Sequence, residues 1–391
     1  MKKQMTSIEL FTGAGGLALG LEQSGWHHAA LVERDKHACS TLRLNQCSGH
    51  PLARQWRLIS DDVRSVRYDE LPGSFDMVAG GPPCQPFSLG GKHRAYRDQR
   101  DMFPEAVRAV RDLRPPCFVF ENVQGLLRQS FASYFQYIVL QLAYPTLVLA
   151  KKESWTEHLS RLERCHTSGC QADLAYRIVY RLLDAAEYGV PQHRRRVFIV
   201  GFRADLQREW SFPEPTHSID RLLWDQWVSG EYWDEHCVSR KQRPIQPEKL
   251  AARIGRLQSD FRLFPPMGKR CRTVRDALCG LSDPRFRSNA VSNHEFRDGA
   301  HPYPGHTGSV LDAPSKTLKA GDHGVPGGEN MLALPDGTYR YYTVRESARI
   351  QTFPDDYRFS GSWTEAMRQI GNAVPVALAK VVGDSILKQV A

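Results

Sequence analysis

The chain has 391 residues, of which 41% are hydrophobic and 24% are charged, and it carries a formal net charge of +9. This composition excludes a collagen-like, low-complexity or disulfide-stapled protein and fits one large or two moderate folded domains. The positive balance favours an anionic partner without identifying it. The N-terminal residues lack the pattern of a signal peptide, and the apolar stretch 137–150 is short and interrupted. We therefore expect a cytoplasmic protein without a membrane span, with most of its cysteines reduced.

Short apolar runs alternate with amphipathic stretches through the first half of the chain. The pattern predicts strands at 7–11, 29–32, 75–79, 117–120 and 197–201, and helices at 17–24, 36–45 and 102–113. Strands that alternate with helices indicate an α/β fold, with a parallel sheet covered on both faces. Ligands of such sheets bind at the carboxyl ends of the strands.

The alternation stops near residue 205, and helical periodicity returns at 363–388. We predict one domain at 1–204 plus 358–391 and a smaller, irregular domain at 205–357. Residues 240–297 contain 14 Lys/Arg against 5 Asp/Glu, an excess as large as that of the whole chain, interleaved with phenylalanines. That mixture favours a nucleic-acid surface over a merely solvated face.

The segment 150–172 has the pattern of an insertion between sheet elements. It contains Cys165 and Cys170 on either side of His166, but no second pair of zinc ligands follows. A surface loop is therefore favoured over a zinc site, and we predict no metal site.

A glycine-rich turn, 11–16, joins the first predicted strand to the first helix. Glycines let the backbone approach a ligand closely, and a helix N-terminus offers free N–H groups. Glu33 ends the second strand and could accept both ribose hydroxyl protons, while Asp62 could accept from an adenine amine and Phe11 could stack on the ring. The pattern alone also suits a nicotinamide or flavin cofactor, or a tight turn without a ligand, although its spacing differs from GxGxxG.

Cys84 follows the strand 75–79 in a turn of glycines and prolines, 80–88. A lone cysteine is usually a small buried hydrophobe, but this surrounding predicts a rigid, exposed turn at the ligand edge of the sheet. The segment 89–100 combines glycines with several cations, which suits a lid that closes over DNA.

Glu121 ends the next strand, within plausible reach of Cys84. Alternation along an extended chain predicts that Arg194 and Arg196 point to one face. A buried ion pair is the alternative interpretation of Glu121 with an arginine. Addition of a thiolate to carbon 6 of cytosine would activate carbon 5, while a protonated glutamate at N3 and an arginine at O2 would stabilise the developing charge. The target base must be flipped out of the duplex to reach such a site.

Together these segments resemble the cytosine-5 DNA methyltransferase family, in the order in which that family carries its motifs. The matching motifs are Phe11-x-Gly13-x-Gly15-Gly16, Pro83-Cys84-Gln85, Glu121-Asn122-Val123, Gln192-x-Arg194-x-Arg196, Arg345-Glu346-x-Ala348-Arg349-x-Gln351-x-Phe353-Pro354 and Gly371-Asn372-Ala373-Val374-Pro375. The resemblance implies a Rossmann-like, S-adenosylmethionine-dependent methyltransferase domain with a target-recognition domain.

The resemblance also implies roles for the matching residues. Catalysis would rest on Cys84 as nucleophile, Glu121 at N3, and Arg194 and Arg196 at the base and its phosphate. The S-adenosyl-L-methionine pocket would comprise Phe11, Gly13, Gly15, Gly16, Glu33, Asp62, Pro83, Met102, Asn372 and Val374. The expected DNA contacts are Ser88, Lys92, Arg94, Lys269, Arg270 and Arg272. Arg34 stands where the family often has an aromatic residue, which puts stacking from that side in doubt.

The resemblance implies double-stranded DNA as substrate and a bacterial enzyme, monomeric on DNA, that protects host DNA in a restriction–modification system beside a separate endonuclease. A tRNA cytosine-5 methyltransferase is the nearest alternative, but its Cys-Phe-Thr signature is absent from 205–340. A catalytically silent DNA-binding regulator is less consistent with intact Cys84, Glu121 and Arg196. A Rossmann dehydrogenase would have no use for a basic recognition domain.

Overall fold

The computed structural model describes residues 4–83, 101–169, 172–261, 264–286, 291–304, 306–320 and 330–390. Contacts between Cα atoms divide the chain into two compact units. The sheet unit comprises Met1–Leu183, Arg195–Pro213 and Ala379–Ala391, and the second unit comprises Asp184–Arg194 and Glu214–Leu378. The functional domain boundaries expected from the sequence stay a prediction.

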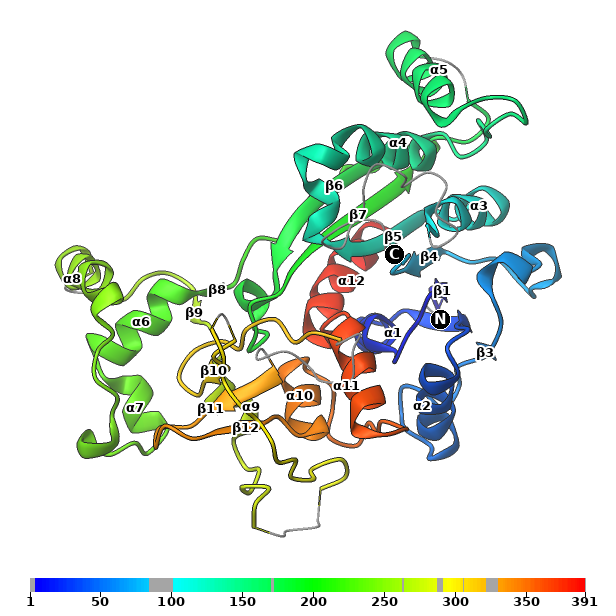
Figure 1. Ribbon diagram of the computed structural model, residues 1–391. Coiled ribbons are helices and arrows are strands. Elements are labelled where there is room, and N and C mark those ends of the chain that lie inside the picture. Colours follow the sequence, from blue (N-terminus) through cyan, green and yellow to red (C-terminus); the bar gives the residue numbers. More distant parts are fainter. Residues whose placement is uncertain are drawn as a thin grey trace. The chain divides into compact units, whose positions relative to one another are not determined.

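A seven-stranded sheet organises the sheet unit (Figure 1). Its strands are β1 (Thr6–Leu10), β2 (His27–Val32), β3 (Leu58–Ile59), β4 (Met77–Gly80), β5 (Cys117–Val123), β6 (Tyr176–Asp184) and β7 (Arg195–Arg203). They lie in the order β3-β2-β1-β4-β5-β7-β6. The pairs β1/β2, β1/β4, β2/β3 and β4/β5 are parallel, whereas β7 runs antiparallel to β5. The predicted α/β class is therefore confirmed.

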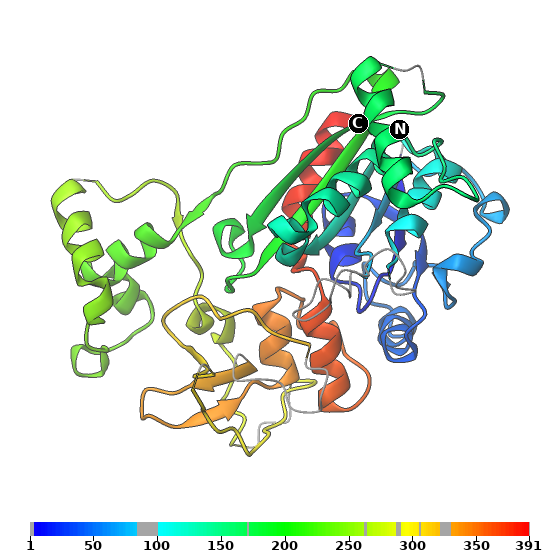
Figure 2. The same cartoon turned by 45° about the horizontal axis from the view of Figure 1, so that its top comes forward.

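Helices cover both faces of this sheet (Figures 1 and 2). They are α1 (Gly16–Gln23), α2 (Lys36–Cys47), α3 (Phe103–Leu113), α4 (Ala132–Ala143) and α12 (Val376–Val390), while α5 (Trp155–Ser168) packs on α4. Apolar side chains of α3 and α4 share one core cluster with Leu10, Phe118 and Phe120 of the strands. On the opposite face α12 packs closely against the end of α1, where a Cβ at Gly383 would lie 2.4 Å from Ser24 Oγ. The sheet is thus buried on both sides, as parallel sheets usually are.

The second unit contains short helices and two small sheets. Its helices are α6 (Ile219–Trp227), α7 (Glu231–Glu235), α8 (Ala251–Asp260), α9 (Val274–Leu278), α10 (Val344–Ile350) and α11 (Trp363–Asn372). The sheets pair β8 (His217–Ser218) with β9 (Lys269–Arg270), and β10 (Ser309–Val310) with β11 (Met331–Ala333) and β12 (Tyr339–Tyr341). Among the described residues, the region 205–357, which was expected to be irregular, therefore contains the five short helices α6 to α10.

The motif 345–354 contributes two buried charged residues to the second unit. Arg345 is fully buried and donates to the backbone carbonyls of Ser292, Pro354 and Tyr357. Glu346 pairs with Arg340 at 2.6 Å. Buried charges need such partners, and among these groups Arg340 Nε has no hydrogen-bond partner, so the bonds of Arg345 and Glu346 indicate a structural role for this motif.

The predicted helix 363–388 is two helices, because the chain is extended at Ala373 and Pro375 follows. Proline has no N–H and disfavours helical conformation in the preceding residue, so α11 ends and α12 begins anew. By length and composition alone, the stretch Trp363–Val390 could cross a membrane, but 61% of its most apolar window is buried inside the protein. A buried core helix of a folded protein meets the same criteria of length and composition.

Candidate functional site

The turn that leads to Cys84 is described as far as Pro83. Cys84, Ser88, Lys92 and Arg94 lie outside the described residues, which resume at 101. Up to that point the turn is fixed from two sides. The side-chain amide of Asn122, on β5, donates to the carbonyl of Pro82 at 2.9 Å, and the N–H of Met102 donates to the carbonyl of Pro83 at 3.4 Å. The residue preceding Cys84 is therefore tied to the start of α3.

Two glycines allow this turn to pass close to its neighbours. A Cβ at Gly80 would lie 2.6 Å from the carbonyl oxygen of Leu10, so only glycine fits there without a backbone shift. A Cβ at Gly81 would lie 3.4 Å from Oε2 of Glu121. The carboxylate of Glu121 therefore lies directly beside the turn that leads to Cys84.

Glu121 and Arg196 form an ion pair at this edge of the sheet. Arg196 Nε lies 2.8 Å from Glu121 Oε1, and the two side chains are 14% and 10% exposed. The antiparallel register places Arg196 opposite Val123, so neighbouring strand ends bring the pair together. Burial lowers the pKa of Arg196, and the charge of Glu121 opposes that shift. Of the predicted catalytic residues that the structure describes, these two are in contact.

Arg194 has a different environment from Arg196. Its side chain is fully buried, and its Nη atoms donate to the carbonyls of Leu318 at 3.0 Å and Gly371 at 2.6 Å. Arg194 precedes β7, which begins at Arg195, so the expectation that strand alternation places both arginines on one face stays a prediction. The role of Arg194 at the base stays a prediction. In this structure its side chain connects the backbone at Leu318 to the backbone at Gly371 within the second unit.

The glycine-rich turn after β1 is held by the carboxylate of Glu33. Oε2 accepts the N–H of Gly13 at 2.6 Å, while Oε1 accepts those of Arg34 at 2.8 Å and Asp35 at 2.7 Å. Gly13 and Gly15 have φ values of 56° and 84°, which favour glycine. A carboxylate oxygen has about two acceptor positions, so Oε2 keeps one for a hydroxyl. The carboxylate of Glu33 can therefore accept a hydrogen bond from a ribose hydroxyl.

Other residues of the expected cofactor pocket lie on several elements. Phe11 leaves β1 with a φ of 57° and packs half-buried against the core. Asp62 follows β3 and binds Arg34 at 2.9 Å and Arg64 at 2.7 Å. The hydrogen bond from Arg64, followed by those from backbone and Arg34, lowers the pKa of Asp62 in spite of partial burial. Asp62 is therefore an ionised acceptor.

The remaining pocket candidates are divided between the two units. Met102 is buried and precedes α3, whereas Pro83 is exposed. Gly16 begins α1. Asn372 and Val374 belong to the second unit, at the end of α11 and just after it. Their role at a cofactor stays a prediction.

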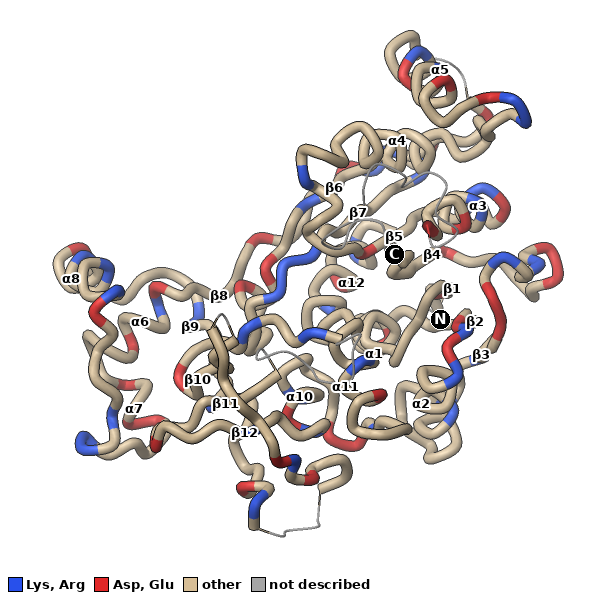
Figure 3. Tube along the Cα trace, viewed as in Figure 1, with Lys and Arg blue, Asp and Glu red and all other residues tan. Residues whose placement is uncertain are grey.

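The three residues that were predicted to contact DNA on and after β9 differ in exposure and in ion pairing. Lys269 and Arg272 are exposed. Arg270 points inward, binds both oxygens of Asp276 at 2.7 and 3.0 Å, and reaches Glu235 at 2.8 Å. Its guanidinium is thus engaged by two carboxylates. Figure 3 shows basic and acidic positions interleaved along α6, α7 and α8, so part of the basic excess is neutralised within this unit.

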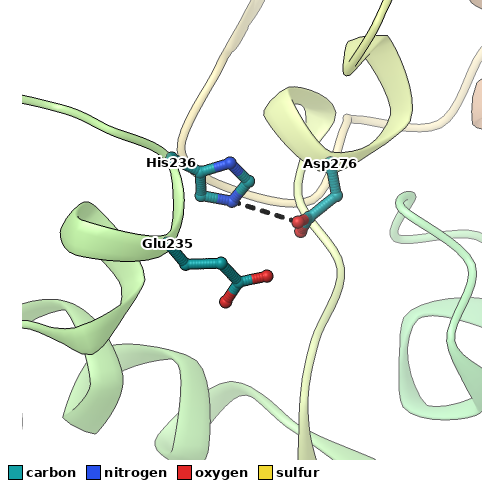
Figure 4. Close-up of side chains that lie close together, drawn as sticks. All are labelled: Glu235, His236 and Asp276. Atoms are coloured by element: carbon teal, nitrogen blue, oxygen red, sulfur yellow. Dashed lines mark ion pairs between the residues drawn. The ribbon is translucent and has the colours of Figure 1, made fainter.

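The same carboxylates belong to a cluster with metal-ligand chemistry (Figure 4). Glu235, His236 and Asp276 bring ligand atoms within 4.8 Å of one another, with His236 Nε2 3.1 Å from an oxygen of Asp276. The guanidinium of Arg270 already supplies a positive charge to both acids. The cluster is therefore a salt-bridge network in this structure. Cys165, one half of the zinc candidate considered from the sequence, is disulfide-bonded, and Cys170 lies outside the described residues.

Sequence comparison connects this geometry to known proteins. The family model described as C-5 cytosine-specific DNA methylase matches residues 5–144 and 170–388. The Type II methyltransferase M.PspPI of Psychrobacter sp. is 32% identical over 388 residues, covering 97% of this chain and 78% of its own length. The Type II methyltransferase M.NgoMIV of Neisseria gonorrhoeae is 31% identical over 390 residues and is covered to 98% on both sides.

Solved structures share the fold. A prophage-encoded E. coli protein described as a DNA modification methyltransferase superposes with a TM-score of 0.61 at 20% identity, covering 98% of this chain and 99% of its own. The S. pombe Dnmt2 methyltransferase superposes with a TM-score of 0.54 at 17% identity, covering 98% and 97%. At such identities the likeness concerns the fold alone.

Proposed function

Because the chain belongs to the C-5 cytosine-specific DNA methylase family, we propose that it methylates carbon 5 of one cytosine within a specific duplex DNA sequence. Members of this family use S-adenosylmethionine in general, and the cofactor would supply the methyl group as an electrophile. Relatives named as Type II methyltransferases support a role in a restriction–modification system. In that role the protein would act on cytoplasmic DNA as a monomer, and a separate endonuclease would cut unprotected sites.

The observation that carries the mechanism is the contact between Glu121 and Arg196 beside the turn that leads to Cys84. The thiolate of Cys84 adds to carbon 6 of the flipped cytosine and forms a C–S bond, which makes carbon 5 nucleophilic. Negative charge then develops on the ring. A proton on Glu121 at N3 and the guanidinium of Arg196 at O2 stabilise it. After methylation, a base such as a water molecule takes the proton from carbon 5, the C–S bond breaks to release the thiolate of Cys84, and the proton on N3 returns to Glu121, which restores the aromatic ring.

The residues present fit the cofactor. Glu33 holds the glycine-rich turn through Gly13 and keeps an acceptor position for a ribose hydroxyl. Asp62 is ionised, and its two oxygens already accept four hydrogen bonds from Arg34 and Arg64, so an adenine amine would have to replace one of these bonds. Phe11, at the turn, offers an aromatic face. We expect these three residues to bind and orient the adenosine part.

DNA contact would come from two parts of the chain. Lys269 and Arg272 are exposed and available to phosphates, whereas Arg270 would first have to leave its two carboxylate partners. Ser88, Lys92 and Arg94 follow Cys84 in the chain and would contact DNA near the flipped base.

Bisulfite sequencing of plasmid DNA from cells that express the chain tests this function. We expect one cytosine in one recurrent sequence to resist conversion, and no resistance with Cys84→Ala. Labelled methyl transfer to duplex DNA and to tRNA in parallel separates the two substrates. Methylation of tRNA without methylation of DNA would contradict the proposal.

A further inference from the structure

The C-terminal end of α11 is capped by side chains from two other segments of the second unit. An Nη atom of Arg194 donates to the carbonyl of Gly371 at 2.6 Å, and the side-chain amide of Gln351 donates to the carbonyl of Ile370 at 2.8 Å. The last carbonyls of a helix have no partner within the helix, and the helix dipole favours a cation at that end. Arg194 therefore helps to fix the last turn of α11.

The residue that this cap holds in place is Asn372, which is the last residue of α11 and directly follows Gly371. Gly371 is buried, and a Cβ there would clash with the backbone nitrogen of Ala320, so the turn packs closely on its neighbour. Asn372 itself is exposed. The end of α11 thus presents an accessible side-chain amide on a tightly held backbone, which is the property of a group that is ordered before its ligand arrives.

Arg194 is itself held on several sides. Its second Nη atom donates to the carbonyl of Leu318 at 3.0 Å, and its backbone N–H donates to Oδ1 of Asp184 at 3.1 Å. Arg194 is fully buried, whereas the side chain of Arg196 is 14% exposed. To reach a phosphate, Arg194 would have to leave the carbonyls of Leu318 and Gly371 without this donor, and an unsatisfied buried carbonyl is costly. The burial of Arg194 therefore favours a role inside the protein.

We propose that Arg194 is a positioning residue that holds Asn372 in place for the cofactor, and that Arg194 does not contact DNA. This inference rests on the proposed function, because Asn372 belongs to the S-adenosylmethionine pocket that the family resemblance implies. It differs from the role at the base and its phosphate that the same resemblance implies for Arg194. Of the two arginines, only Arg196 then acts at the base. Loss of the Arg194 side chain should therefore weaken binding of the cofactor and leave binding of DNA unchanged.

The test measures the two kinds of binding separately. Titration calorimetry gives the Kd for S-adenosylhomocysteine, the demethylated form of the cofactor, and a duplex with the mapped target sequence is bound at several salt concentrations. Arg194→Met removes both donors and keeps an apolar side chain in the buried site. We expect it to raise the Kd for S-adenosylhomocysteine roughly tenfold or more, as loss of a hydrogen bond from a charged group does. The slope of log K against log salt should equal that of the wild type, because no phosphate contact is lost.

Two further variants separate positioning from general stability. Arg194→Lys keeps the charge and can reach one of the two carbonyls, so it should raise the Kd for S-adenosylhomocysteine less, and it carries the test if Arg194→Met does not fold. Arg345→Met is the matched control, because Arg345 is also fully buried in the second unit and donates to three backbone carbonyls that lie outside α11. It should lower the free energy of unfolding, as Arg194→Met does, and leave both binding measurements unchanged.

Three results would overturn the inference. The first is a wild-type Kd for S-adenosylhomocysteine in the folded Arg194 variants. The second is a salt slope that falls by about 1 in Arg194→Met, which indicates a lost phosphate contact. The third is an equal rise of the Kd in Arg345→Met, which would assign the effect to stability alone. A wild-type protein that binds S-adenosylhomocysteine but leaves every cytosine unmethylated would instead contradict the proposed function.

Discussion

Substitution of Asn122 by alanine tests directly how the turn before Cys84 is held. Asn122 is buried, its Nδ2 donates to the carbonyl of Pro82 at 2.9 Å, and its Oδ1 accepts the N–H of Val123 at 2.9 Å. In Asn122→Ala the buried carbonyl of Pro82 loses this donor, which costs about 1–3 kcal/mol of folding free energy. Val123 is partly exposed, so water can replace much of the second bond. We therefore expect a loss of stability of about 2 kcal/mol.

The effect on the reaction should exceed the effect on stability. The freed turn carries the nucleophile, and displacement of a reacting atom by about 1 Å can lower a rate on the order of 100-fold. We expect single-turnover methyl transfer by Asn122→Ala, measured with labelled cofactor below the melting temperature, to fall by roughly that factor. Asn45→Ala is the matched control, since Asn45 is a buried asparagine of α2 whose amide donates to the carbonyl of Thr41. A rate for Asn122→Ala within about threefold of the control would refute the reasoning.

Other predictions follow from packing and charge. Gly383→Ala should destabilise the protein by about 1–3 kcal/mol in denaturant unfolding, because the new methyl group would overlap the end of α1. Gly255→Ala in α8, where nothing lies within 4 Å, should not destabilise it. Burial raises the pKa of Asp276, but hydrogen bonds from Arg270 and Thr273 together with the charge of Arg270 outweigh burial and lower it. Its stabilising contribution is therefore complete above the unfolded pKa of about 4 and is lost as the pH falls through the lower folded value. The free energy of unfolding of Asp276→Asn should therefore depend less on pH in that range than that of the wild type. The same pH dependence in both proteins would contradict this. Lys269→Ala and Arg272→Ala should each lower the slope of log K against log salt by about 1, and an unchanged slope would exclude a phosphate contact.

Much of the sheet unit could be predicted because its signals are local. Short apolar runs located β1, β4 and β5, and the periodicity of α3 was visible in its sequence. The order of these elements then placed Glu121 at the edge of the sheet that carries the Cys84 turn. The edge strand β6 was missed, although Tyr176, Ile178, Tyr180 and Leu182 follow the alternation of a strand in its sequence.

The partners of individual arginines could not be predicted, because the folded structure and not the spacing along the chain brings them together. Arg194 binds carbonyls 124 and 177 residues away, and no spacing rule reaches that far. Arg270 stands in a basic segment, yet its two carboxylate partners, Glu235 and Asp276, come from α7 and α9. Net charge over a segment counts such residues as available cations although folding has already neutralised them.

The central claim is that Cys84 forms a covalent bond with carbon 6 of the target cytosine. A duplex with 5-fluorocytosine at the mapped position tests it directly, because fluorine on carbon 5 cannot leave as a proton does and the adduct is trapped. With S-adenosylmethionine present, the account predicts a complex that survives denaturing electrophoresis and a peptide whose mass places the DNA on Cys84. A trapped complex linked through another residue, or no trapped complex under conditions in which the unmodified duplex is methylated, would contradict it.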